Sequence, residues 1–288
     1  MPHTADCLAR LKSDIDRLAF REGFDAHQVA SEHGEEKLRK IEVALERGRK
    51  GSKSKLPPSV RVEFAEKCVI DSARRFRDRT HRDLLPQERS WRVYHPVACM
   101  PNRLRGELRF YGQPLTCIDI TSSQPYFLGL LFRDRLAERG LDRREVHDYL
   151  ELVRGGEFYE WFMQQLGIAV EHRKEFKGVL FRDLFFGKHC WATKTFKVFS
   201  SRFPSLGQCI KEFHRSTESL AMRLQRMEAE MIYGKVLPAL QSAFPFIPIV
   251  TIHDAILVPS PMARAAENVI LQQFPTPCPP TLHLTPPS

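Results

Sequence analysis

The chain has 288 residues, which at roughly 100–200 residues per domain allows one large domain or two small ones. Its 44 Lys and Arg residues outnumber 35 Asp and Glu residues and give a net charge of +9, so we expect a polyanionic partner, although a solvated basic surface gives the same count. The seven cysteines form no Cys-x-x-Cys pair, which argues against a disulfide framework and a structural zinc site and favours a reducing cytoplasm. No apolar stretch approaches the roughly 20 residues that cross a bilayer, which argues against a membrane function.

Residues 1–88 are predicted to be a helical and basic N-terminal region. Apolar side chains recur at helical spacing within residues 5–48, and a further helix is expected over residues 59–80. The intervening residues 47–58 are rich in Lys, Arg, Gly, Ser and Pro, which is typical of a flexible connection that is either a plain linker or a phosphate-contacting loop. The end of the second helix carries closely spaced arginines that are expected to follow a nucleic-acid strand: Arg74, Arg75, Arg77 and Arg79.

Residues 89–274 are predicted to form one α+β unit, because short β-rich runs alternate there with longer helical patterns. Strands are expected over residues 91–95 and 115–120, and a hairpin over 247–258. Helices are expected over residues 122–139, 172–187 and 208–243. The last segment, residues 275–288, is rich in Pro and Thr and is expected to be disordered.

Two apolar runs each deliver an aspartate, Asp119 near the end of residues 115–120 and Asp254 within residues 247–258. A buried strand that ends in a carboxylate places a hard oxygen ligand at the edge of a sheet, and two such strands can hold two Mg²⁺ ions roughly 3.5–4 Å apart. Mn²⁺ is the expected substitute. Each aspartate also has an alternative interpretation as a helix cap or a turn residue.

A basic and aromatic stripe lies between the two aspartates in the chain. On a helix, residues that recur every four positions share one slowly rotating face, and these residues are Arg173, Lys177, Phe181 and Phe185. Two cations followed by aromatic rings suit a nucleoside triphosphate, since Arg and Lys bind phosphate oxygens and a ring stacks on the base or the sugar edge. The alternative interpretation is an ordinary amphipathic helix with a basic edge.

These segments resemble, in residue type and in order, the motifs of family A DNA polymerases and of the related phage-type single-subunit RNA polymerases. Residues 117–124, Cys-Ile-Asp-Ile-Thr-Ser-Ser-Gln, are similar to motif A, a strand ending in a metal-binding Asp. Residues 173–187 are similar to motif B, the fingers helix with the pattern Arg-x3-Lys-x3-Phe-x3-Tyr-Gly. His253-Asp254-Ala255 is similar to motif C, the His-Asp dipeptide at a hairpin tip.

The resemblance covers roughly residues 90–260 and implies a polymerase palm with an antiparallel sheet, helical fingers and a thumb-like N-terminal region. It implies that Asp119 and Asp254 are catalytic metal ligands. It further implies that Arg173 and Lys177 hold the triphosphate, with Lys177 as proton donor to the pyrophosphate, and that the aromatic side chains at 181 and 185 and Gln124 contact the nucleotide.

The resemblance also implies nucleic-acid contacts around these residues. His253 is expected beside the primer terminus, and Gln225, with Glu228 and Glu230, on a polar helix against the minor groove. An arginine-bearing segment before motif A is expected to contact template-primer through Arg92, Arg103 and Arg105. The expected partners are therefore a DNA primer-template, or RNA in its place, and nucleoside triphosphates.

The sequence departs from the family pattern at three positions. One additional residue precedes Gly187, and Phe185 stands where the family has a tyrosine. Gln124 stands five residues after Asp119, where the DNA enzymes carry a Glu that restricts the sugar 2′ position. Since an amide can hydrogen-bond a 2′-hydroxyl as a donor, we expect looser sugar discrimination.

Three other functions are compatible with the residues. The first is a non-catalytic nucleic-acid-binding accessory protein that keeps a polymerase-like fold, although such a protein needs no pair of metal ligands. The second is a single-subunit RNA polymerase-like or primase-like enzyme. The third is a two-metal nuclease or phosphodiesterase, which leaves the cation stripe without a role because a hydrolase binds no triphosphate.

Overall fold

The computed structural model describes residues 5–46, 56–79, 84, 86–138, 144–186, 190–216, 218–275 and 278–286. These residues form a mixed α+β structure in which many helices surround one antiparallel sheet, as predicted. The strands are β1 (Ala19–Phe20), β2 (Leu108–Phe110), β3 (Gln113–Ile120), β4 (Val250–Ile252), β5 (Ala255–Pro259) and β6 (Leu282–Thr285). Their order is β1-β2-β3-β5-β4, and β6 pairs with β3.

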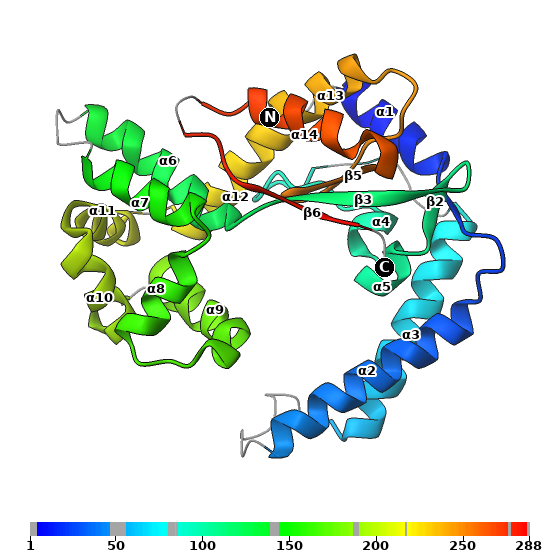
Figure 1. Cartoon of the computed structure of the whole chain (residues 1–288), viewed down its shortest axis with the longest axis horizontal. Helices are drawn as coiled ribbons and strands as arrows, with labels where there is room; N and C mark the ends of the chain where they lie inside the picture. Colours follow the sequence, from blue (N-terminus) through cyan, green and yellow to red (C-terminus); the bar gives the residue numbers. More distant parts are fainter. Residues whose placement is uncertain are drawn as a thin grey trace.

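The side chains of the long strand β3 alternate between a covered face and an open face of the sheet. Ile118 and Ile120 are buried, whereas Cys117 and Asp119 are only half-buried, as expected when successive side chains point to opposite faces. Helix α14 (Ala263–Gln272) packs on β3 and β5, and α1 (Ala5–Asp16) packs on β4, on the upper side of the sheet in Figure 1. Asp119 therefore lies on the face that these helices leave open.

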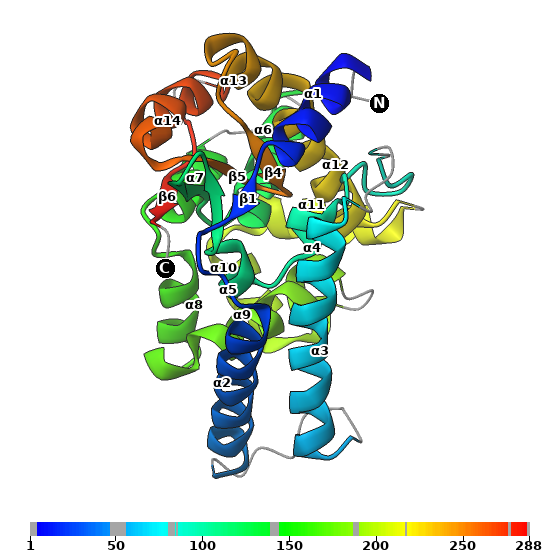
Figure 2. The ribbon, with the colours of Figure 1, turned by 90° about the vertical axis from the view of Figure 1, so that its right-hand side faces the viewer.

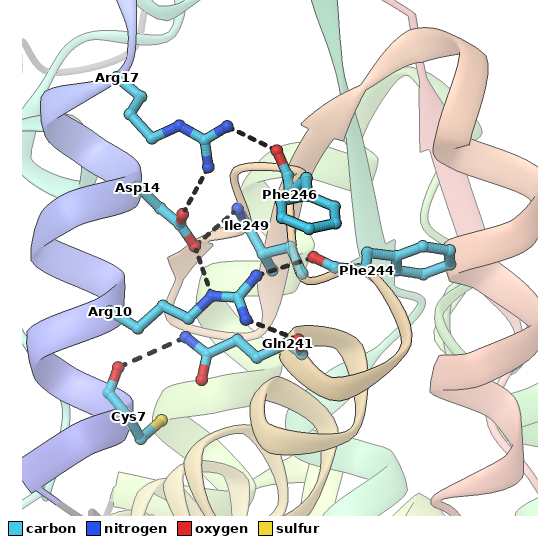
Figure 3. A network of polar contacts seen from close by, with 8 residues as sticks. All are labelled: Cys7, Arg10, Asp14, Arg17, Gln241, Phe244, Phe246 and Ile249. Atoms are coloured by element: carbon cyan, nitrogen blue, oxygen red, sulfur yellow. Dashed lines mark hydrogen bonds and ion pairs between the residues drawn. The ribbon is translucent and has the colours of Figure 1, made fainter.

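Helix α1 is fixed to the chain segment that leads into β4 (Figure 3). Arg10 donates hydrogen bonds to the carbonyl oxygens of Gln241 and Phe244, at 2.6 and 2.7 Å. Asp14 accepts a hydrogen bond of 3.2 Å from the backbone N–H of Ile249 and pairs with both Arg10 and Arg17. These contacts, together with the pairing of β1 with β2, join residues 5–20 to the sheet.

Helices α2 (Ala26–Glu46) and α3 (Pro58–Arg77) form a long antiparallel pair that projects away from the sheet (Figures 1 and 2). Arg103 on α5 (Asn102–Arg105) pairs with Glu32 at 2.6 Å and with Glu36 at 3.5 Å, which fixes α2 to the body. Helix α3 confirms the helix that was predicted over residues 59–80. Most of the predicted basic connection, residues 47–55, lies outside the described residues.

Most of the remaining helices belong to one of two groups. One group is a second lobe, which lies below the other end of the sheet in Figure 1, and the other group lies above the sheet. The lobe contains α7 (Arg144–Arg154), α8 (Phe158–Gln165), α9 (Arg173–Phe181), α10 (Lys194–Arg202) and α11 (Pro204–Arg215). The connecting and covering helices are α4 (Pro96–Cys99), α6 (Ser123–Glu138), α12 (Leu220–Met231) and α13 (Leu237–Ala243). Single 3-10 turns occur at Val170–His172, Cys190–Ala192 and Ser260–Met262.

The structure corrects three predictions about local structure. Residues 91–95 are no strand, since Val93 contributes only an isolated bridge with Pro86. The predicted helix over 208–243 is divided into α11, α12 and α13, with a π-helical turn at Ile232–Val236. The C-terminal tail, predicted to be disordered, contributes β6, whose Leu282 and Leu284 pack against the core. Among the described residues, no helix combines the length and apolar composition that a membrane span requires.

Candidate functional site

The sheet brings Asp119 and Asp254 together. In the antiparallel pairing of β3 with β5, Asp119 lies opposite Ala255, and Asp254 immediately precedes Ala255 in the two-residue turn after β4. The predicted hairpin over 247–258 is confirmed, and it places the second carboxylate beside the first from a distance of more than 130 positions in the chain. Both side chains are half-buried.

The two carboxylates repel one another. Burial and the negative charge of Asp254 raise the pKa of Asp119 to about 6, while Lys177 and a hydrogen bond from the backbone of Ile120 lower it. A divalent cation between the carboxylates relieves this repulsion, so the donor set fits Mg²⁺ or Mn²⁺. No third His, Cys, Asp or Glu completes a ligand cluster within the described part of the chain, and the remaining ligands of such an ion would be water and substrate oxygens.

The nearby cysteine is protonated at neutral pH when no metal is bound. Burial and the two carboxylates raise the pKa of Cys117 to about 11, so its thiol stays protonated, whereas metal binding requires the thiolate. Cys117 therefore acts as a small half-buried side chain on the open face of β3.

Each aspartate lies within three residues of a non-glycine residue whose backbone is in the left-handed region. His253 has a φ of 58° in the turn before Asp254, and Ser122 has a φ of 55° three residues after Asp119. For residues other than glycine this conformation is uncommon and is concentrated at functional sites. His253 is half-buried, its ring packs edge-on against Tyr94 at 5.2 Å, and burial lowers its pKa, which favours a neutral imidazole.

The predicted cations lie on α9, directly beside α8. Arg173 pairs with Glu160, and the Cζ atom of Arg173 and the Nζ atom of Lys177 lie 5.0 and 5.4 Å from the ring centroid of Tyr159. Both cations are exposed, and Lys177 is near enough to Asp119 to affect its pKa. The structure thus places Lys177 within electrostatic reach of Asp119.

Tyr159 belongs to none of the predicted motifs. It is 1% exposed, and burial raises its pKa strongly; Ser122 and Arg173 lower that pKa, and Glu160 and Asp254 raise it. Its ring and hydroxyl therefore lie between the cations of α9 and the loops that bear the aspartates. The sequence offers no signal that distinguishes Tyr159 from its core neighbours Phe158 and Phe162.

The aromatic end of the stripe requires a correction. Helix α9 ends at Phe181, and residues Arg182–Phe186 form a π-helical turn, which holds one residue more than an α-helical turn. This additional residue rotates the chain, so Phe185 is 1% exposed in the core and offers no surface to a nucleotide, whereas Phe186 is 53% exposed. Phe181 remains half-buried and stacks on Phe186 at 6.0 Å. The additional residue before Gly187 is thus absorbed within the helix.

Glu228 on α12 accepts hydrogen bonds from Arg92 and from the first residues of α6. Arg92 donates to its Oε1 from Nε and Nη2 at 2.9 and 2.6 Å, and Ser123 Oγ and Gln124 Nε2 donate to Oε2 at 3.0 and 2.9 Å. Glu228 is 1% exposed. Because Gln124 turns its amide nitrogen toward this carboxylate, its carbonyl oxygen is the atom left for another partner. Arg92, expected to contact template-primer, has two nitrogen atoms engaged in this ion pair.

Most of the other predicted nucleic-acid-binding arginines have structural partners. Arg103 pairs with Glu32 and Glu36, as described above. Arg105 donates to the Met100 carbonyl oxygen at 2.5 Å and to the Asn102 side chain, and burial lowers its pKa. Gln225 is half-buried on α12, one turn before Glu228.

The arginines at the end of α3 divide into two groups. Arg79 donates to the carbonyl oxygens of Ile15 and Leu18, both at 3.3 Å, which fixes α3 to α1. Arg77 is exposed and lies 5.7 and 5.1 Å from the rings of Phe20 and Phe24. Two further arginines are exposed on the same turn, Arg74, which pairs with Asp71, and Arg75.

The C-terminal strand adds a residue that the sequence prediction missed. In the β3–β6 pairing, His283 lies opposite Asp119, so both side chains stand on the open face of the sheet. His283 is exposed, whereas its neighbours Leu282 and Leu284 are half-buried against the core.

No protein-family model matches the chain, and no curated protein matches it.

Proposed function

We propose that the chain is a template-directed nucleotidyltransferase, a minimal DNA polymerase of the family A type that extends a primer. The observation that carries the proposal is the pairing of β3 with β5, which places Asp119 beside Asp254 at one end of an antiparallel sheet, with Lys177 of α9 within electrostatic reach of Asp119. A hydrolase that uses two carboxylates has no need of the exposed cations on α9. The cations therefore favour transfer from a triphosphate over hydrolysis.

Each residue has a role that follows from its charge. The carboxylates of Asp119 and Asp254 would hold the cations, and when bound these ions neutralise the phosphates and lower the pKa of the attacking hydroxyl. Arg173 would bind phosphate oxygens in a bidentate manner after leaving Glu160. Lys177 would donate a proton to the departing pyrophosphate.

The α2–α3 pair and the lobe with α8 and α9 are arranged in a way that supports binding of nucleic acid between them (Figure 1). Figure 1 shows the α2–α3 pair and the lobe with α8 and α9 extending from opposite ends of the sheet, on the side away from α13 and α14. The first would serve as thumb and the second as fingers. The exposed Arg74, Arg75 and Arg77 on α3 would contact the phosphate backbone.

One observation favours a second candidate, an enzyme that also accepts ribonucleotides. Gln124 donates to Glu228 and keeps its carbonyl oxygen as a free acceptor for a ribose hydroxyl, whereas a glutamate at this position beside Glu228 would meet a like charge. The expected relaxation of sugar choice thus rests on an amide oxygen as acceptor, not on the amide nitrogen as donor.

A primer-extension assay tests the proposal. The whole chain is incubated with a labelled primer-template, with deoxyribonucleotides or ribonucleotides, and with Mg²⁺ or Mn²⁺. We expect template-dependent extension that chelation abolishes. Binding of the primer-template without any extension in all metal and nucleotide combinations would indicate the non-catalytic accessory function, and shortening of the primer would indicate a nuclease.

A further inference from the structure

We propose that Tyr159 is a positioning residue of the nucleotide site, whose ring holds the two cations of α9 at a fixed place relative to Asp119 and Asp254. This inference rests on the proposed function. It assigns a role to a side chain outside motifs A, B and C, on a helix that precedes the cation stripe in the chain.

The ring of Tyr159 supports both cations. The guanidinium carbon of Arg173 lies 5.0 Å from the ring centroid and the ammonium nitrogen of Lys177 lies 5.4 Å from it, within the range of cation–π attraction. One turn of α9 separates the two cations, so a single ring serves both. Glu160, the next residue of α8, adds an ion pair to Arg173.

The other end of the side chain is buried near the segment that follows Asp119. The Tyr159 hydroxyl oxygen is buried, and it lies near Ser122, three residues after Asp119, and within the electrostatic influence of Asp254. The side chain thus extends from this segment to the helix that bears the cations. Its edge-on contact with Phe158, at 5.5 Å between centroids, holds the ring in the core.

Fixing a long side chain before the ligand arrives lowers the entropy that binding must remove. Lysine and arginine lose more rotamer freedom than most side chains when they are ordered. Without the ring, Arg173 would keep only its ion pair with Glu160, and both cations would lose a contact that orders them before the triphosphate arrives. Loss of the ring should therefore weaken binding of the nucleotide and leave binding of the primer-template unchanged.

Variants of Tyr159 separate the ring from the hydroxyl. Tyr159→Phe keeps the ring, and Tyr159→Leu removes it. We expect Tyr159→Leu to raise the KM for each nucleotide about tenfold with a smaller change in kcat, and Tyr159→Phe to restore a KM close to that of the unmodified chain. Should the leucine variant fail to fold, Tyr159→Met fills a similar volume with a flexible side chain and gives the same contrast.

Tyr149→Leu is the matched control. Tyr149 on α7 is as deeply buried, its ring packs edge-on against Phe158, Phe199 and Phe203, and its hydroxyl donates to the Pro125 carbonyl oxygen. We expect this control to lower the melting temperature without raising the KM for nucleotides. An equal rise in KM for Tyr149→Leu, or no rise for Tyr159→Leu and Tyr159→Met, overturns the inference.

Binding of a Mg²⁺–triphosphate, measured by calorimetry, separates this inference from the proposed function. If the unmodified chain neither binds the triphosphate nor extends a primer, the proposed function fails. If it does both and the affinity of Tyr159→Leu is unchanged, only the role of Tyr159 fails.

Discussion

Two opposing influences act on the ionisation of Glu228. Burial raises its pKa to about 7 and the charge of Asp254 acts in the same direction, whereas Arg92 and Ser123 lower it as hydrogen-bond donors. Burial outweighs the donors, because the side chain has almost no contact with solvent. Glu228 is therefore only partly ionised at neutral pH, and its carboxylate form holds Arg92 and Gln124 in place at the cost of a buried charge.

The raised pKa of Glu228 makes stability depend on pH. A carboxyl whose pKa is higher in the folded chain than its ordinary 4.5 binds more protons when folded, between 4.5 and about 7. Its contribution to the free energy of unfolding therefore decreases as the pH rises through that window. We expect Glu228→Gln to remove this decrease, measured by denaturant unfolding in metal-free buffers from about pH 5 to about pH 8. Parallel pH profiles for the two proteins would contradict the assignment.

Lys177 is expected to act on the nucleotide and not on the duplex. Lys177→Ala should lower kcat/KM for incorporation by about 100-fold or more, because it removes a charge that stabilises the leaving phosphates, while the Kd for primer-template stays within about twofold. Lys174→Ala, which removes an exposed cation of the same helix, is the control and should change neither. Equal loss of duplex affinity and of turnover in Lys177→Ala would make α9 a duplex-binding element.

At the scale of elements, the π-helical turn after α9 decides which aromatic side chain is exposed. Phe185→Ala should lower the free energy of unfolding by about 3–5 kcal/mol, because a buried ring is removed from the core. Phe186→Ala should change it by no more than about 0.5 kcal/mol, since that ring is half exposed. Thermal or denaturant unfolding of the two variants checks this, and similar costs for both would contradict the register given by the π-helical turn.

The sequence predicted those strands and helices that are determined by the residue types within one short segment. The alternation of Ile118 and Ile120 with Asp119 predicted β3, and the two-residue turn at His253–Asp254 predicted the β4–β5 hairpin. The π-helical turn could not be predicted, because the four-residue spacing of Arg173, Lys177, Phe181 and Phe185 also fits an uninterrupted α-helix. Strand β6 could not be predicted either, since it is stable only through pairing with β3, far away in the sequence.

At the scale of the whole molecule, the site depends on contacts between distant segments. The approach of Asp119 to Asp254 was predictable because Asp119 lies on one predicted strand and Asp254 lies at the tip of a predicted hairpin, both delivered by apolar runs. The roles of Tyr159, Glu228 and His283 were not, because each depends on how a helix or strand packs against another element, and the residue types alone are common in cores and on surfaces. Arg79 is a similar case, because its position in a basic run does not reveal that it donates hydrogen bonds to the carbonyl oxygens of Ile15 and Leu18.

The α2–α3 pair is expected to contribute the salt dependence of nucleic-acid binding. Replacing Arg74, Arg75 and Arg77 with Gln should weaken binding to all sequences alike and flatten the dependence of log Kd on log salt by about one unit for each phosphate that the protein no longer neutralises. Arg264→Gln, an exposed arginine on α14 behind the sheet, is the control and should leave the slope unchanged. An unchanged slope in the triple variant would show that these arginines only solvate the surface.

The central claim is that Asp119 and Asp254 form one cation site for nucleotidyl transfer, and a double-mutant comparison of primer extension tests it most directly. The rates of Asp119→Asn, Asp254→Asn and the double variant are compared with the exposed control Asp148→Asn, with primer-template binding measured in parallel. We predict that each single substitution lowers the rate about 10³-fold, that the double variant is little slower than either, and that binding persists. Extension at the unmodified rate by either single variant would contradict the claim.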